Sequence, residues 1–179
     1  MFCDLLGYTD TLEILLRKLG YVRKSGAYQR PDKRQVAFVG DFIDRGPKIR
    51  ETLHILRNMI DSGNAIAVMG NHEFNAISFH TPHVEKGGFF RDHRYKEIRQ
   101  HLGTLEQFKY FDHEWADFLE WFKTLTLFFE NDDFRLVHAC WENQQFAFLR
   151  EHFKGVTPTF LSESNDKQTG SELYHAVND

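Results

Sequence analysis

Hydrophobic residues at helical spacing indicate the first element of the chain. Leucines recur three and four positions apart after Thr9, at Leu12, Leu15, Leu16 and Leu19, which is the period of one helix face. Acidic residues in the first turn and Gly20 at the end match the charge and capping preferences of a helix. The pattern therefore predicts a helix over residues 9–20, followed by a polar loop that contains Gly26 and Pro31.

Two short apolar runs, residues 36–39 and 65–69, predict buried strands. Between them Pro47 can begin a helix whose apolar face repeats every three or four residues and which ends at 62–64. Strands that are apolar throughout are typical of parallel sheets, so this order predicts a right-handed crossover in an α/β fold. Each run ends on a glycine and a polar residue, Gly40-Asp41 and Gly70-Asn71, where α/β sheets usually carry chemistry.

The second half of the chain changes character. Residues 80–113 scatter histidines among glycines, basic residues and aromatics, which predicts a cap or loop region with some helix. The aromatic stripe that follows has helical spacing and is more typical of core than of a base-stacking platform; it comprises Trp115, Phe118, Trp121 and Phe122. Alternating runs at 125–130 and 134–139 predict a hairpin. We expect a short helix over 143–152, a polar tail over 157–179 and a final helix near 171–177.

The composition predicts a single domain over residues 1–179. The chain is 41% hydrophobic and contains 18 Phe, which is enough for a core without disulfides. Its 22 Lys and Arg against 26 Asp and Glu disfavour a nucleic-acid partner, and no apolar run indicates a signal peptide or a membrane span. Cys3 and Cys140 lie far apart, which favours a reduced, cytoplasmic protein. The oligomeric state is left open.

Three predicted strand ends supply side chains suited to metal and phosphate chemistry. Asp41 offers two carboxylate oxygens, Asn71 an amide oxygen and His138 a ring nitrogen. This mixture suits Mn, Fe or Zn better than Ca. Two such ions held close together would bind a phosphate and share the hydroxide that attacks phosphorus.

Neighbouring residues supply the remaining parts of a phosphoester hydrolase. Arg45 can form a bidentate fork on phosphate oxygens. His72 adjoins a predicted ligand and can protonate the leaving oxygen, while Asp44 can fix the orientation of the His72 ring. In His80-Thr-Pro-His83 no cysteine accompanies the histidines, so a solvated loop facing substrate explains them better than a metal site.

The segments GDFIDRG, GNHE and VHAC resemble the calcineurin-like metallophosphoesterases, in particular bacterial members related to Ser/Thr phosphoprotein phosphatases and diadenosine tetraphosphate hydrolases. The resemblance covers roughly residues 4–152. It implies an α/β fold with a β-sandwich flanked by helices, incomplete at the C-terminus, and two divalent metal ions, with Mn first and Fe or Zn as alternatives. It assigns metal ligation to Asp4, Asp41, Asn71 and His138, catalytic roles to Asp44, Arg45 and His72, and substrate contact to Arg45 and His72.

Two departures from the family pattern bear on activity. The first motif, Asp-x-His followed by Gly, falls on residues 4–7, so Leu6 stands where a histidine ligand is expected. A later Gly-His motif has no counterpart between Gly155 and Asp179. These departures predict the front portion of a longer phosphatase, with weakened metal binding.

The leading functional prediction is an enzyme that hydrolyses phosphomonoesters, on phosphoserine or phosphothreonine of a protein or on a small phosphoester. A dinucleoside polyphosphate is the alternative substrate. A degenerate binding module that keeps the phosphate pocket through Arg45 and His72, and a truncated product that folds poorly alone, are the competing interpretations. Substrate selectivity is expected to lie in residues 80–113.

Overall fold

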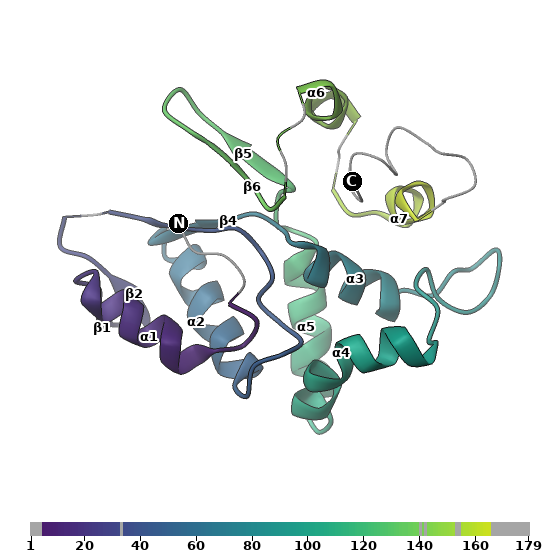
Figure 1. Ribbon diagram of the computed structural model, residues 1–179, viewed down its shortest axis with the longest axis horizontal. Helices are drawn as coiled ribbons and strands as arrows, with labels where there is room; N and C mark the ends of the chain where they lie inside the picture. The colour runs from purple at the N-terminus through teal and green to yellow at the C-terminus, as the bar shows by residue number, and fades with distance from the viewer. Residues whose placement is uncertain (1–4, 33, 140, 142, 153–154, 166–179) are drawn as a thin grey trace.

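A computed structural model describes residues 5–32, 34–139, 141, 143–152 and 155–165 (Figure 1). These residues contain both helices and strands, which confirms the predicted α/β class. Their bounds are α1 (Thr9–Lys18), β1 (Val22–Lys24), β2 (Ala27–Gln29), β3 (Val36–Phe38), α2 (Ile49–Asp61), β4 (Ala65–Ala67), α3 (Asn71–His80), α4 (Tyr95–Phe108), α5 (Asp112–Phe122), β5 (Phe128–Glu130), β6 (Arg135–Val137), α6 (Asn143–His152) and α7 (Pro158–Ser164).

The central strands form the predicted parallel crossover. β3 and β4 pair in parallel, with Val36 opposite Ala65 and Phe38 opposite Ala67, and α2 connects them. Val68, just after β4, makes a further parallel bridge to Thr126. The segment before β5 thus lies next to β4, and the antiparallel β5–β6 hairpin follows as predicted.

Both faces of this small sheet are covered. Val36 and Phe38 of β3 point into the main core, whereas Val39 faces a second, smaller cluster with Val68 and with Leu136 of β6. Successive residues of a strand point to opposite faces, so the sheet separates two apolar layers. This two-layer packing explains why both strands are apolar throughout.

The helices contribute most of the side chains of the main core. Figure 1 shows α3 and α4 beside α5, and α1 with the β1–β2 hairpin beside α2. The aromatic stripe of α5 is buried as predicted, at Trp115, Phe118, Trp121 and Phe122. None of the helices within the described ranges is long and apolar enough to cross a membrane.

Several elements differ from the sequence prediction. The predicted loop after α1 contains the β1–β2 hairpin, because Ser25 and Gly26 both have positive φ, as a tight two-residue hairpin loop requires. The crossover helix α2 begins at Ile49, two residues after Pro47. α3 was not predicted, whereas the 14-residue α4 agrees with the expectation of some helix within 80–113.

The region predicted as a polar tail begins with a packed helix. Thr157 caps α7 by accepting a hydrogen bond from Phe160 N at 3.1 Å, and Pro158 follows at the first helical position. Phe160 packs edge-to-face on Phe74 of α3, and Leu161 is buried. Apolar contact at two positions thus orders a segment whose average composition is polar. The helix predicted near 171–177 lies outside the described residues.

The two glycines that end the central strands pack against each other. A Cβ on Gly40 would lie 2.3 Å from Gly70 N, and one on Gly70 would lie 2.4 Å from both the backbone nitrogen and Oδ1 of Asp41. Gly40 also has φ of +85°, a conformation that side chains rarely adopt. The strand ends can approach this closely only because neither residue carries a side chain.

We expect Gly70→Ala to destabilise the protein by roughly 2 kcal/mol or more, since its methyl group must displace backbone atoms of the Asp41 loop. Gly63→Ala is the matched control. Gly63 has φ of +70° but open space where its Cβ would lie, so only the backbone penalty of about 1 kcal/mol applies. Urea unfolding of both variants measures the difference, and an equal loss in the two would contradict the close approach.

Candidate active site

The loop after β3 is bonded to the start of the chain. Leu6 N donates to Asp41 O at 2.8 Å, and Leu6 O accepts from Gly46 N. Leu6 is buried with φ of +48°, and Asp41 has φ of +57°. The segment that aligns with the family's first motif therefore lies against the Asp41 loop, although Asp4 itself lies outside the described residues.

A buried carboxylate joins the two central strand ends. Glu73 of α3 is fully buried and accepts hydrogen bonds from the backbone nitrogens of Asp41, Phe42 and Gly70 at 2.8 to 3.0 Å. Burial and the charge of Asp41 raise the pKa of Glu73 to about 7, against the opposing effect of these three donors. The Glu73 carboxylate thereby joins the segments that follow β3 and β4.

Asp41 and His138 face each other across the strand ends. His138 Nδ1 lies 2.5 Å from Val39 O, which can only accept, so Nδ1 is the donor. In the neutral ring Nε2 then carries a lone pair, and it lies 3.4 Å from Asp41 Oδ1. Two acceptors that face each other, one of them a histidine oriented by a backbone carbonyl, form part of the ligand set expected for a divalent cation.

The wider ligand set remains a prediction. Asn71 occupies the first position of α3, next to His72, and lines the same cavity as Asp44 and Arg45. Within the described part of the chain, no three His, Cys, Asp or Glu side chains group closely enough to bind a metal unaided. The amide of Asn71 and the carboxylate of Asp4 would have to complete the set.

The structure brings Asp44 and His72 into direct contact. His72 Nδ1 lies 2.6 Å from Asp44 Oδ2, and its Nε2 lies 3.9 Å from Asp41 Oδ2. Burial alone would lower the pKa of His72, but the Asp44 hydrogen bond and the neighbouring carboxylates raise it above its ordinary value. The ring therefore retains its proton more readily than a free histidine, with Nε2 directed toward the predicted metal ligand.

Helix α4 supplies two further partners of Asp44 that the sequence analysis missed. His101 Nδ1 lies 2.6 Å from Asp44 Oδ1, and Thr104 Oγ1 donates to the same oxygen at 2.6 Å while accepting from Asp44 N at 3.1 Å. Burial raises the pKa of Asp44, yet the hydrogen bonds from His101, His72 and Thr104 outweigh burial and lower it to about 2.

A helical pattern could have indicated that these two residues lie on one buried helix face. His101, Thr104 and Phe108 are all buried and lie three and four positions apart, which is the spacing of one helix face. Gly103 lies between them and faces Asp44 O, where a Cβ would come within 2.7 Å. The absence of a side chain at Gly103 therefore lets α4 approach the Asp44 loop.

The first of the two histidines predicted to form a solvated loop is instead half-buried at the end of α3. Trp115 Nε1 donates to His80 Nε2 at 3.1 Å, and His101 Nε2 lies 3.2 Å from the same atom. Burial, with the neighbouring His101 and His93, lowers the pKa of His80 to about 4, so the ring is neutral at pH 7. His83 remains in a loop, where its Nδ1 accepts from Lys86 N.

A cavity of about 350 Å³ opens beside the His72 ring. Its lining includes Arg45, which is exposed, together with residues of α3, α4 and the segment between these helices. The predicted substrate contacts Arg45 and His72 thus share one opening with Asn71.

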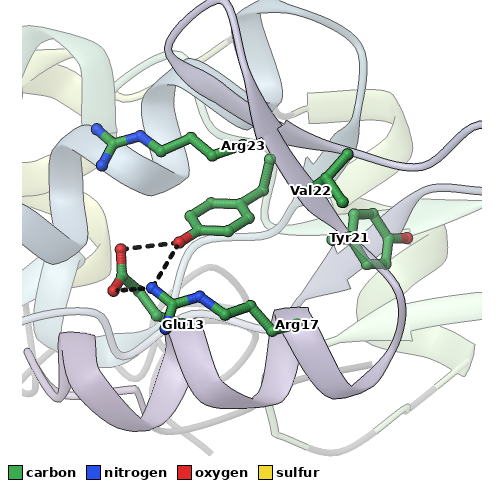
Figure 2. A pocket seen from close by; sticks show the side chains of 6 residues that line it. Glu13, Arg17, Tyr21, Val22 and Arg23 are labelled. Carbon is green, nitrogen blue, oxygen red and sulfur yellow. Dashed lines mark hydrogen bonds and ion pairs between the residues drawn. The ribbon is translucent and has the colours of Figure 1, made fainter.

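A second hollow lies between α1 and the β1–β2 hairpin (Figure 2) and has a volume of about 400 Å³. The Tyr28 hydroxyl donates to Glu13 at 2.9 Å and accepts from Arg17 at 3.4 Å, while Arg17 and Glu13 pair at 2.9 Å. These groups satisfy one another, and the described residues that line the hollow include none of the predicted site residues.

Comparison with known proteins identifies the family of the chain. The family described as calcineurin-like phosphoesterase matches residues 4–169. Similar bacterial proteins are named bis(5'-nucleosyl)-tetraphosphatase PrpE [asymmetrical]: those of Halalkalibacterium halodurans, Oceanobacillus iheyensis and Bacillus subtilis are 45%, 41% and 36% identical over 69 residues. The matching segment covers 38% of this chain and 28% of each relative.

We expect Asp44→Asn to lower the free energy of unfolding by roughly 2 kcal/mol at pH 7, because a pKa of about 2 stabilises the folded state relative to the ordinary value of 3.8. This stabilisation is present above pH 4 and is lost as the pH falls toward 2. Urea unfolding between pH 2 and 7 measures it. A difference from wild type that does not shrink with acidification would show that the carboxylate is not stabilised by its three partners.

Proposed function

We propose that this chain, which belongs to the calcineurin-like phosphoesterase family, contributes a metal-dependent site that hydrolyses phosphoester or phosphoanhydride bonds, with a dinucleoside polyphosphate as substrate. The observation that carries the proposal is the Asp44–His72 contact of 2.6 Å, which directs His72 Nε2 toward Asp41. A histidine oriented by a carboxylate beside a cation site can donate a proton to a leaving oxygen.

The chain's own residues have separate tasks in this proposal. Arg45, at the mouth of the cavity, binds the oxygens of the phosphate to be cleaved. His72 protonates the departing oxygen from Nε2, and Asp44 keeps the ring in that orientation through Nδ1. Asp41, Asn71 and His138 would hold the metal ions, together with Asp4. Such ions polarise phosphate oxygens and activate a water molecule for attack.

Two substrate classes follow from the sequence, and the relatives support one of them. The bacterial relatives that match this chain are named as bis(5'-nucleosyl)-tetraphosphatases. The printed names of these relatives do not mention a phosphorylated protein as substrate. The dinucleoside polyphosphate, the alternative in the sequence analysis, therefore becomes the preferred substrate.

We expect Asp41→Asn to reduce Mn-dependent hydrolysis of p-nitrophenyl phosphate and of diadenosine tetraphosphate by at least about 100-fold, since it removes one charge at the predicted metal site. Asp10→Asn is the matched control, because Asp10 is an exposed carboxylate that pairs with Lys48 at 2.6 Å. It should retain full activity. Hydrolysis by Asp41→Asn at the wild-type rate would contradict the proposal.

Leu6 favours a second candidate function, a phosphate-binding module without turnover. It occupies the position of an expected histidine ligand, and its backbone is bonded directly to the Asp41 loop. A site that lacks one ligand binds metal more weakly, while Arg45 and His72 remain able to contact a phosphate. Phosphate binding without metal-dependent hydrolysis would identify this function.

We expect Leu6→His to raise Mn affinity about tenfold or more, because an imidazole nitrogen would be added to the predicted ligand set. Titration calorimetry with Mn reports this affinity without reference to activity. Leu5→His is the control, since residue 5 adjoins the same segment but does not fall on the histidine position of the motif. Equal Mn affinity in Leu6→His and wild type would show that the first motif is misaligned.

A further inference from the structure

The cavity beside His72 extends beyond the groups that a single phosphate needs. Besides Arg45 and His72, its lining includes Asn75, Arg91 and Gln100, and Arg91 is hydrogen-bonded to the other two. Asn75 follows Asn71 by one turn of α3, which is about 6 Å along the helix axis. A substrate phosphate at the predicted metal site would therefore leave the region around Arg91 free for another part of the substrate.

Arg91 is held in place by neutral groups. Its guanidinium donates to Asn75 Oδ1 at 2.7 Å and to Gln100 Oε1 at 3.0 Å, and its backbone nitrogen donates to Ser78 O at 3.0 Å. No carboxylate of the described residues lies within 4 Å of this half-buried guanidinium. An arginine fixed by two amides keeps its full charge and most of its five N–H donors for a ligand.

The surrounding charges favour an anion. Arg45, Arg91 and Arg99 line the cavity, against the carboxylates of Asp44 and Glu97. The Asp44 carboxylate is already engaged by His72, His101 and Thr104. Three guanidinium groups against two carboxylates leave a small excess of positive charge in the cavity, in a chain whose net charge is −4, and local positive charge attracts anionic ligands.

We propose that Arg91 forms a second phosphate subsite, which binds the phosphates adjacent to the one being cleaved in a phosphoanhydride chain. The inference rests on the proposed function, because it takes this cavity as the substrate cleft. A phosphomonoester would not reach Arg91, whereas a nucleoside polyphosphate would engage Arg45 and Arg91 together. Arg91 would then distinguish substrates by the number of linked phosphates.

The contacts of Arg91 also join α3 to α4, so a purely structural role must be separated from binding. Loss of the contacts with Asn75 and Gln100 would lower stability and would weaken all ligands to a similar degree. Loss of a phosphate subsite would weaken only ligands with more than one phosphate. Comparing orthophosphate with tripolyphosphate distinguishes these two effects.

The test is titration calorimetry of the full chain with orthophosphate and with tripolyphosphate, in EDTA, for wild type, Arg91→Gln and Arg94→Gln. Arg94 is the matched control, because it lies three residues away, is exposed and pairs with Asp92 at 2.5 Å. We expect Arg91→Gln to bind tripolyphosphate about tenfold more weakly, as loss of a charge-assisted contact predicts, and to bind orthophosphate like wild type. Unchanged tripolyphosphate affinity, or an equal loss for both ligands, would overturn the subsite.

A second variant that keeps the positive charge makes the test possible even if Arg91→Gln does not fold. Should Arg91→Gln fail to melt cooperatively, Arg91→Lys preserves a cation without the bidentate fork, and an intermediate tripolyphosphate affinity in that variant supports the subsite. Affinity in Arg91→Lys equal to that of wild type for both ligands would count against it.

Hydrolysis assays of the same proteins test the proposed function separately. If wild type hydrolyses diadenosine tetraphosphate, Arg91→Gln should raise KM for it and leave p-nitrophenyl phosphate turnover unchanged. If wild type hydrolyses neither compound but binds tripolyphosphate through Arg91, the proposed function fails and the subsite stands.

Discussion

The site depends on one buried carboxylate that joins two strand ends. Glu73 accepts three backbone hydrogen bonds, two from the loop after β3 and one from the end of β4. Each donor would otherwise be buried without a partner, at a cost of about 1–3 kcal/mol. The close contact of Gly40 and Gly70 makes this arrangement possible, and the positions of Asp41 and His72 follow from it.

Helix α4 supports the same loop from the other side. Gln107 bridges Gly46 O and Ile49 N, and one turn earlier Thr104 bonds both the backbone and the side chain of Asp44. The region predicted to be a cap is therefore part of the framework of the site. A shift of α4 will therefore move Asp44, and the movement of Asp44 will change the orientation of His72.

The charges divide between a tightly paired centre and an open cavity. Asp44 is surrounded by donors, and Asp41 faces His72 and His138. Farther from the strand ends, Arg91 is bonded to amides and not to carboxylates. Groups that fix geometry are thus neutralised locally, whereas groups at the cavity retain charge for a ligand.

The sequence alone determined the elements whose signal is local: the periodic helices α1, α2 and α5, the apolar strands β3 and β4, and the motifs at their ends. Glycine followed by a polar residue at each strand end was enough to identify Asp41 and Asn71 as candidates, because parallel strands end at a common edge. Tertiary structure alone decided the contacts of His101, Thr104 and Arg91. Their partners lie across the fold or on another helix, at separations of 57 and 60 residues for the bonds to Asp44, and no local pattern encodes a contact made by packing α4 against a distant loop.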